Sequence, residues 1–261
     1  MPLRGRFVEV FSSAQGEGPH VGASTLFVRL GGCDLRCRWC DSPHTWRPTD
    51  TCRLETRRGS GAFRVVPNPV AIDEIVAAAE ALEVERHRFV SLTGGEPLLQ
   101  PEVVAALGAA LRGRGPRLLL ETAGHLPDAL AAVREAVDVV SMDWKLASEV
   151  RREGEPSAVL AQPGRSFTAL HERFLMVARG APESYVKLVV SETSRDEELR
   201  AAWEAIARVD PATPVVLQPV TPRAGALRPP AERLLALQRE AARTLEDVRL
   251  IPQTHPLYGA P

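Results

Sequence analysis

The sequence lacks the features that build disulfide-stabilised or membrane proteins. It has four cysteines in 261 residues, and three of them lie between positions 33 and 40, which does not make a disulfide framework. No apolar run approaches the length of a bilayer span, and the first residues lack the apolar core of a secretory signal. We therefore expect a cytoplasmic protein with no membrane partner.

The chain also has almost no net charge. Its 32 Lys and Arg residues balance 33 Asp and Glu residues, which gives a formal net charge of −1. This balance provides no electrostatic footprint for nucleic acid, so we expect a small-molecule substrate and no nucleic-acid partner. At 261 residues, the chain is long enough for one large domain with a buried core, and we expect a single domain over 1–261.

Short apolar runs alternate with segments of helical periodicity, which predicts an α/β fold with a parallel sheet and right-handed crossovers. The predicted strands are 25–30, 89–92, 117–121, 137–143, 185–190, 215–218 and 248–251. The predicted helices are 71–82, 101–112, 127–136, 167–179, 196–209 and 230–245.

Two segments do not fit this alternation. The insertion 47–68 is rich in Arg and Gly without a clear period, which is typical of a solvated loop. A lid, or a docking surface for an acidic electron donor, is the functional alternative, because long loops inside compact domains are often functional. The stretch 147–181 is polar and interrupted by Gly and Pro around one helix, 167–179.

Polar residues follow the carboxyl ends of the predicted strands. In a barrel or partial barrel these ends meet at one face, where such enzymes carry their active sites, so the sequence predicts one shared site. The segments concerned are 33–40, 93–97, 121–122, 143–145 and 218–219.

The most specific signal is the C-x3-C-x2-C spacing of Cys33, Cys37 and Cys40, directly after Gly31 and Gly32. The glycines let the backbone wrap closely, and three soft sulfur ligands suit an iron–sulfur cluster with one open iron. A four-ligand zinc site remains an alternative, because His44 can supply the fourth ligand, whereas Cys52 has no paired partner. A non-enzymatic iron–sulfur or zinc module that senses redox state is the corresponding function.

A second motif, Gly94-Gly95-Glu96-Pro97, follows a predicted strand. By itself it fits a plain turn between strand and helix. Its glycines also let backbone carbonyls approach a ligand closely, and Glu96 can accept a hydrogen bond from an ammonium group.

Together with the cysteine spacing and the aromatic Trp39 before the last cysteine, this motif resembles the radical S-adenosylmethionine (SAM) superfamily. The resemblance implies an incomplete (β/α) TIM-like barrel, a [4Fe–4S] cluster on the three cysteines, SAM, and a one-electron donor of the flavodoxin or ferredoxin type. Asp143 and Lys145 also fit a strand-end salt bridge. The implied SAM contacts are Trp39, Asp41, Gly94, Gly95, Glu96, Asp143, Lys145, Gln218 and Pro219.

The N-terminal segment is similar to the 7-carboxy-7-deazaguanine synthase family in its run Gln15-Gly16-Glu17-Gly18 and in Arg29. Gln and Glu side chains can pair with the amide and amine edge of a pterin, and an inward Arg can bind a carboxylate bidentately. A hairpin turn and a rim salt bridge are the structural alternatives. The implied substrate contacts are Ala14, Gln15, Gly16, Glu17, Arg29, Thr93, His255 and Pro261, the last two on a tail near 252–261 that closes over the site.

This resemblance implies a carbon–nitrogen lyase of queuosine precursor synthesis, acting as a homodimer. The reaction converts 6-carboxy-5,6,7,8-tetrahydropterin into 7-carboxy-7-deazaguanine with loss of ammonia. It also implies Mg²⁺ at Ser42, where the family commonly has Thr, although hard cations usually prefer carboxylates. Leu146 to Glu149 departs from the family's Pro-Ser-Ser-Gly run. A glycyl-radical-enzyme activase is the nearer alternative, but it has no use for Gln15 and Arg29 as pterin contacts.

Overall fold

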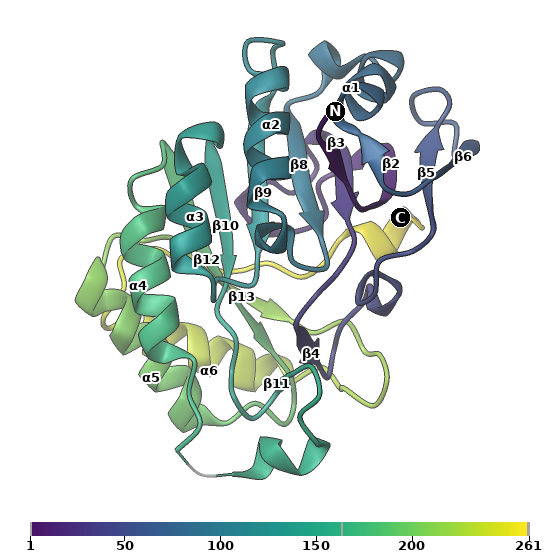
Figure 1. Cartoon of the computed structure of the whole chain (residues 1–261). Helices are drawn as coiled ribbons and strands as arrows, with labels where there is room; N and C mark the ends of the chain where they lie inside the picture. Colours follow the sequence, from purple (N-terminus) through teal and green to yellow (C-terminus); the bar gives the residue numbers. More distant parts are fainter. Residues whose placement is uncertain (1, 163, 260–261) are drawn as a thin grey trace.

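The computed structural model describes residues 2–162 and 164–259 and is built on one ten-stranded sheet (Figure 1). From one edge to the other, the strand order is β14-β13-β12-β10-β9-β8-β3-β2-β5-β6. The strands are β2 Phe7–Ala14, β3 Ser24–Leu30, β5 Thr51–Glu55, β6 Phe63–Pro67, β8 Phe89–Gly94, β9 Arg117–Thr122, β10 Val139–Asp143, β12 Glu183–Val190, β13 Val215–Pro219 and β14 Val248–Leu250. Neighbouring strands from β14 to β3 are parallel, whereas β2 pairs antiparallel with β3.

The α-helices lie along one side of this sheet (Figure 1). They are α1 Ile72–Ala81, α2 Pro101–Leu111, α3 Pro127–Val133, α4 Thr168–Ala178, α5 Asp196–Val209 and α6 Ala231–Ala241. Every strand and helix predicted from the apolar pattern is confirmed, and the ends differ by a few residues. No helix among the residues described here is long and apolar enough to cross a membrane.

The parallel strands place alternate side chains on opposite faces, as their two-residue period requires. Val90 and Leu92 of β8 enter the hydrophobic core beneath the helices, and every other strand of this group contributes in the same way. Phe89, Ser91 and Thr93 therefore point to the opposite face. On that face the residues change from apolar to polar toward the carboxyl ends of the strands.

The loop between β2 and β3 covers the beginning of this second face. His20, in the 3₁₀ turn Gly18–His20, lies 4.6 Å from the Phe89 ring and pairs with Glu183 at 2.7 Å. Arg117 contacts the other oxygen of Glu183 at 2.7 Å. These side chains fill the space over the amino ends of the strands. The second face of the sheet is therefore open at the carboxyl ends of the strands.

The prediction of a solvated loop over 47–68 is wrong, because its middle forms the hairpin of β5 and β6 at the edge of the sheet. Cys52 and Leu54 of β5 are fully buried. The alternation of apolar and polar residues in this strand therefore covers only these two apolar positions. The Arg53 guanidinium stacks 4.0 Å from the Phe63 ring, and its neighbours Arg58 and Arg64 pair with Glu83 and Glu74. The high arginine content of this segment is therefore the reason why its sequence did not predict the two strands.

Two small ribbons complete the fold. β1 Arg4–Gly5 pairs with β7 Val70–Ala71, and β4 Leu35–Cys37 pairs antiparallel with β11 Val150–Arg152. The second ribbon contains one of the clustered cysteines, since Cys37 is the partner of Val150. It stands at the carboxyl ends of the main strands, below the sheet in Figure 1.

Candidate active site

A cavity of about 480 Å³ opens at the carboxyl ends of the parallel strands. The residues predicted for the shared site that line it are Ala14, Gln15, Gly16, Glu17, Arg29, Cys33, Cys37, Trp39, Cys40, Asp41, Ser42, Thr93, Gly94, Gly95, Asp143, Lys145, Gln218 and His255. The structure therefore brings these residues together around one cavity. Glu96 and Pro219 do not line the cavity, and Pro261 lies outside the described residues.

The three clustered cysteines open onto this cavity from β4 and the loop that flanks it. Burial raises the pKa of Cys33 to about 11 and that of Cys37 to about 12, so binding of iron must displace their protons. In the described part of the chain, no group of three His, Cys, Asp or Glu side chains is placed to hold a single metal ion. A cluster places its thiolates on different irons, so it does not require three side chains around one ion.

Gly94 and Gly95 bring the next strand end close to the cysteine loop. Gly94 has φ of +133°, and a side chain there would place Cβ 2.1 Å from the Leu30 carbonyl oxygen. At Gly95, the added Cβ would lie 2.1 Å from the Gly32 oxygen and 3.0 Å from the Cys33 Cβ. The two backbones pack at a distance that only glycine permits.

Glu96 is fully buried behind the cavity wall. Its carboxylate accepts hydrogen bonds from Thr122 Oγ1, Ala123 N and Leu98 N at 2.8, 2.8 and 2.9 Å. Burial raises the pKa of this carboxyl above its usual range. In the structure Glu96 therefore joins the end of β9 to the Gly94 turn.

A chain of alternating charges crosses the cavity floor. Lys145 Nζ lies 2.7 Å from Asp143 Oδ2, and Lys187 Nζ lies 3.1 Å from Asp143 Oδ1. Lys187 also pairs with Glu17, and Lys145 stands 4.7 Å from the centre of the Trp39 ring. The strand-end salt bridge expected for Asp143 and Lys145 is thus present, and it extends further through Lys187.

These charges determine the pKa of Asp143. Burial would raise this pKa, but the ammonium groups of Lys145 and Lys187 outweigh burial and lower it from 3.8 to about 2. The pairing therefore stabilises the fold above pH 3.8 and loses its effect as the pH falls through about 2.

We expect Asp143→Asn to lower the free energy of unfolding at pH 7 by roughly 2 kcal/mol. Because the wild-type carboxyl is itself protonated in acid, this difference is expected to shrink to about half at pH 3. Urea unfolding of both proteins between pH 7 and pH 3 measures the effect. Asp247→Asn is the matched control, since Asp247 pairs with Arg249 at the exposed surface. A difference that stays constant with pH would contradict this assignment.

Gln15 links the substrate residues predicted from sequence to the end of β9. Its Nε2 donates to Glu121 Oε1 at 3.2 Å, and its Oε1 accepts from the Glu17 backbone N at 3.1 Å. Glu121 also accepts from Ser91 Oγ at 2.5 Å, and burial raises its pKa above the usual range. The result is a buried carboxyl group held on the cavity wall by two donors.

Arg29 reaches the cavity from β3. Its Nε donates to Glu9 Oε1 at 3.0 Å, and its side chain is 15% exposed. Among the described residues, its two terminal nitrogens have no hydrogen-bond partner. A guanidinium oriented by a neighbouring carboxylate, with its remaining donors directed at a cavity, suits a carboxylate ligand.

The tail returns from β14 to the β2–β3 loop (Figure 1). Gln253 Nε2 donates to Glu17 Oε1 at 2.5 Å and to Asp41 Oδ2 at 2.8 Å. The Thr254 backbone N donates to the Gly16 oxygen at 2.9 Å. A Cβ at Gly16 would lie 2.4 Å from His255 Nδ1. The absence of a side chain at Gly16 therefore leaves room for the tail at the cavity rim.

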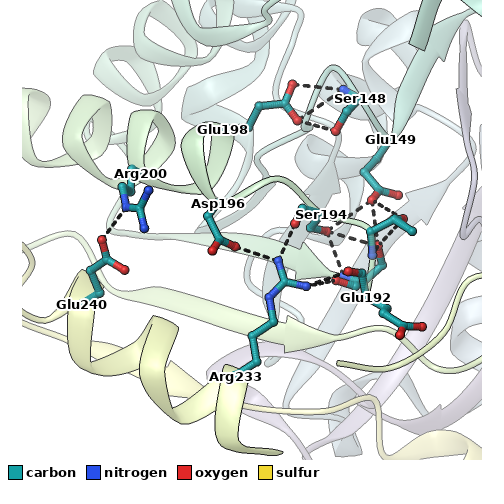
Figure 2. A network of polar contacts seen from close by, with 11 residues as sticks. Ser148, Glu149, Glu192, Ser194, Asp196, Glu198, Arg200, Arg233 and Glu240 are labelled. Carbon is teal, nitrogen blue, oxygen red and sulfur yellow. Dashed lines mark hydrogen bonds and ion pairs between the residues drawn. The ribbon is translucent and has the colours of Figure 1, made fainter. Parts of the chain in front are cut away.

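The segment after Lys145 is held from outside the cavity (Figure 2). Glu149 is buried, and its Oε1 accepts from the hydroxyls of Ser191 and Ser194 at 2.7 and 3.3 Å. Ser148 N donates to Glu198 Oε1 at 3.1 Å, which ties the same segment to α5. The run that departs from the family pattern is therefore part of a polar network at the base of β11.

Sequence reasoning assigned no role to four of the polar residues in this cavity: Glu9, Glu121, Lys187 and Gln253. Lys187 carried a signal, because it interrupts the apolar strand 185–190. Glu121 stood at a predicted strand end but was not assigned a role. Glu9 and Gln253 lie in segments where the polar residues have no regular spacing. Nothing in the sequence therefore distinguishes these two residues from their polar neighbours.

Comparisons with known proteins agree with this geometry. The sequence profile of the radical SAM superfamily matches residues 27–206. The chain is 37% identical over 257 residues to 7-carboxy-7-deazaguanine synthase of Geobacter sulfurreducens, covering 96% of each chain. It is 35% identical to the enzyme of the same name from Methanopyrus kandleri, covering 95% of this chain and 91% of that one. In fold it is similar to the crystal structure of QueE from Escherichia coli, with a TM-score of 0.60, 22% identity and coverage of 97% and 95%.

Proposed function

The chain belongs to the radical SAM superfamily and, within it, to the 7-carboxy-7-deazaguanine synthases, and from this premise we propose its reaction. It converts 6-carboxy-5,6,7,8-tetrahydropterin into 7-carboxy-7-deazaguanine with loss of ammonia, in queuosine precursor synthesis. The observation that carries this proposal is the cavity that joins the three cysteines to Gln15, Glu17 and Arg29. A glycyl-radical activase would not need that second group.

The residues of the cavity fit the two cofactors of the superfamily. Cys33, Cys37 and Cys40 would hold the [4Fe–4S] cluster, and Trp39, Gly94, Asp143 and Lys145 would contact SAM. When the cluster and SAM are bound and the cluster is reduced, the two cofactors supply a 5′-deoxyadenosyl radical. The protein contributes binding, orientation and exclusion of water.

On the substrate side, Arg29 would bind the carboxylate, while Gln15 and Glu17 would pair with the pterin edge. Glu17 is oriented for this by Lys187 and Gln253. Thr93 and His255 line the same cavity and would complete the contacts.

We further propose that the mostly parallel sheet is an incomplete (β/α) barrel and that 1–261 form a single domain. Ser42 would ligate Mg²⁺, for which its hydroxyl, now donating to Asp41 Oδ1 at 2.9 Å, is available at the cavity. The enzyme would work in the cytoplasm as a homodimer and would receive electrons from a flavodoxin or ferredoxin.

The test is turnover under anaerobic conditions. The reconstituted protein receives dithionite, SAM, Mg²⁺ and the carboxytetrahydropterin, and the products are identified by mass spectrometry. Formation of 7-carboxy-7-deazaguanine is the expected result. 5′-Deoxyadenosine without that product would refute the substrate assignment, and absence of both despite a reduced cluster would refute the enzyme assignment.

Arg29→Met is expected to raise KM for the carboxytetrahydropterin roughly 10- to 100-fold, because a charged hydrogen-bond donor to the substrate carboxylate is lost. Steady-state kinetics with varied substrate measures this. Arg53→Met is the control, since Arg53 contacts the same Glu9 at 3.6 Å but is 53% exposed and does not line the cavity. An equal effect of both substitutions would show that Arg29 acts only through Glu9.

A further inference from the structure

Asp34 follows the first clustered cysteine, but its side chain does not line the cavity. Its two carboxylate oxygens lie 3.0 and 2.9 Å from Nε2 of His125, whose side chain is fully buried. An ionised carboxylate can only accept hydrogen bonds, so the imidazole nitrogen is the donor. This contact joins the cysteine loop to the segment after β9, 91 residues further along the chain.

The segment that carries His125 also holds the second motif of the cavity. Thr122 Oγ1 and Ala123 N both donate to the Glu96 carboxylate at 2.8 Å. The end of β9 therefore contacts the glycine motif through Glu96 and the cysteine loop through Asp34. Neither Glu96 nor His125 lines the cavity, so both act from behind its wall.

His125 supplies the strongest contact to the Asp34 side chain. Arg152 Nη1 lies 3.8 Å from Asp34 Oδ2, but the side chain of Arg152 is 45% exposed, so this pair contributes little. The backbone of Asp34 is held separately, because its carbonyl oxygen accepts from Glu153 N at 2.7 Å. The direction of the Asp34 side chain thus depends on the buried imidazole.

Asp34 lies at the centre of a compact turn around the Cys33 sulfur. The Leu35 backbone N donates to Cys33 Sγ at 3.5 Å, so the residues on both sides of Asp34 are linked through that sulfur. A rotation of Asp34 would separate the Leu35 amide from the thiol. Hydrogen bonds behind a metal ligand orient it, and those to the sulfur of a cluster ligand tune the metal.

His125 is an unfavourable residue for packing alone. Its Nδ1 is buried, and within the part of the chain that the structure describes it has no hydrogen-bond partner. An unpaired buried nitrogen is destabilising, whereas an aromatic hydrocarbon of similar shape would avoid that cost. The contribution of His125 is therefore made through Nε2 and its bond to Asp34.

We propose that His125 is a positioning residue for the iron–sulfur cluster: its hydrogen bond to Asp34 fixes the turn that directs the Cys33 thiol into the cavity. His125 acts through Asp34, because its own side chain does not line the cavity. The inference rests on the proposed function in taking Cys33 as a cluster ligand.

The test compares two substitutions with opposite properties. His125→Phe keeps an aromatic ring without a donor, and His125→Gln keeps a nitrogen donor at a position similar to Nε2 without the ring. In the full-length protein without a cluster, alkylation of each cysteine by iodoacetamide is timed by mass spectrometry. Cys37 is the internal reference, because its backbone is held by pairing with Val150.

We expect Cys33 in His125→Phe to react about tenfold faster relative to Cys37, the factor that follows when a hydrogen bond to a charged group no longer holds a loop closed. His125→Gln is expected to restore most of the wild-type rate. A role in packing alone predicts the opposite order, with His125→Phe close to wild type and His125→Gln more reactive.

The same variants are then reconstituted under anaerobic conditions. We expect His125→Phe to release iron to a ferrous chelator about tenfold faster than wild type, with a changed electron paramagnetic resonance spectrum after reduction. His87→Phe is the matched control, since His87 is also buried, lies with Nε2 3.1 Å from the Leu82 oxygen and does not line the cavity. An equal effect at His87 would overturn the proposal.

A wild-type alkylation pattern in His125→Phe, or a faster reaction in His125→Gln than in His125→Phe, would also overturn it. If His125→Phe does not fold, Asp34→Ala removes the acceptor at a half-buried position. The same selective rise at Cys33 then supports the proposal, and a wild-type rate refutes it. A wild-type protein that binds no iron would instead refute the proposed function, because the alkylation measurement requires no cluster.

Discussion

Cys37→Ala is expected to abolish both 7-carboxy-7-deazaguanine and 5′-deoxyadenosine. Cys37 lies on β4, with its thiol at the cavity beside Cys33 and Cys40, and no fourth thiol is near to replace it. If the three cysteines hold the cluster, as proposed, two of its three protein ligands would remain. Iron and sulfide content after anaerobic reconstitution, together with the electron paramagnetic resonance of the reduced protein, measures the loss.

Cys52→Ala is the matched control. Cys52 is fully buried in β5 and does not line the cavity. Its substitution is expected to lower the free energy of unfolding by about 1 kcal/mol, as for a small cavity in a core, with full iron content and turnover. If Cys37→Ala retained wild-type iron and cleaved SAM, the assignment of the cluster ligands would be wrong.

Gly95→Ala is expected to lower turnover about 100-fold, because a displacement of about 1 Å at a reacting group costs that much. The new methyl group would lie 2.1 Å from the Gly32 oxygen, which is backbone of the cysteine loop. The loop must therefore shift, and the position of Cys33 must shift with it. Turnover and iron content are measured together, since the shift is expected to reduce both.

Gly31→Ala tests whether any alanine in this region has the same effect. Its added Cβ would lie 3.4 Å from Pro48, an ordinary contact, and Gly31 does not have a left-handed φ. We expect turnover within about twofold of wild type, as for a substitution that creates no clash. Equal loss at Gly31 and Gly95 would show that the loop tolerates no change and that the contact at Gly95 is not special.

The apolar pattern predicted seven of the ten strands of the main sheet, because six of those seven contain continuous buried runs and the helices between them have a clear period. It did not predict the ribbon of β4 and β11, because each strand has only three residues and their pairing depends on long-range packing. It failed for the β5–β6 hairpin as well, where buried Cys52 and Leu54 alternate with exposed residues. Short strands contain too few positions for a period to be recognised.

For the site, sequence identified residues that stand in motifs or at strand ends. It did not identify Lys187, whose role depends on Asp143 and Glu17 from two other segments. It also placed Glu96 among the SAM contacts, which stays a prediction, and it did not foresee that both carboxylate oxygens of Glu96 accept hydrogen bonds from the end of β9. Such features depend on which side chains meet in three dimensions, and no spacing in the sequence records that.

The charge chain on the cavity floor has a thermodynamic consequence. Lys187 is shared between Asp143, on the side of the predicted cofactor contacts, and Glu17, on the side of the predicted substrate contacts. A ligand that draws either carboxylate away from Lys187 changes the strength of the other pair. If SAM contacts Asp143 and the pterin contacts Glu17, as proposed, their affinities would be linked reciprocally: whatever factor SAM imposes on the pterin, the pterin would impose on SAM. The single ammonium group of Lys187 would then couple the two ligands.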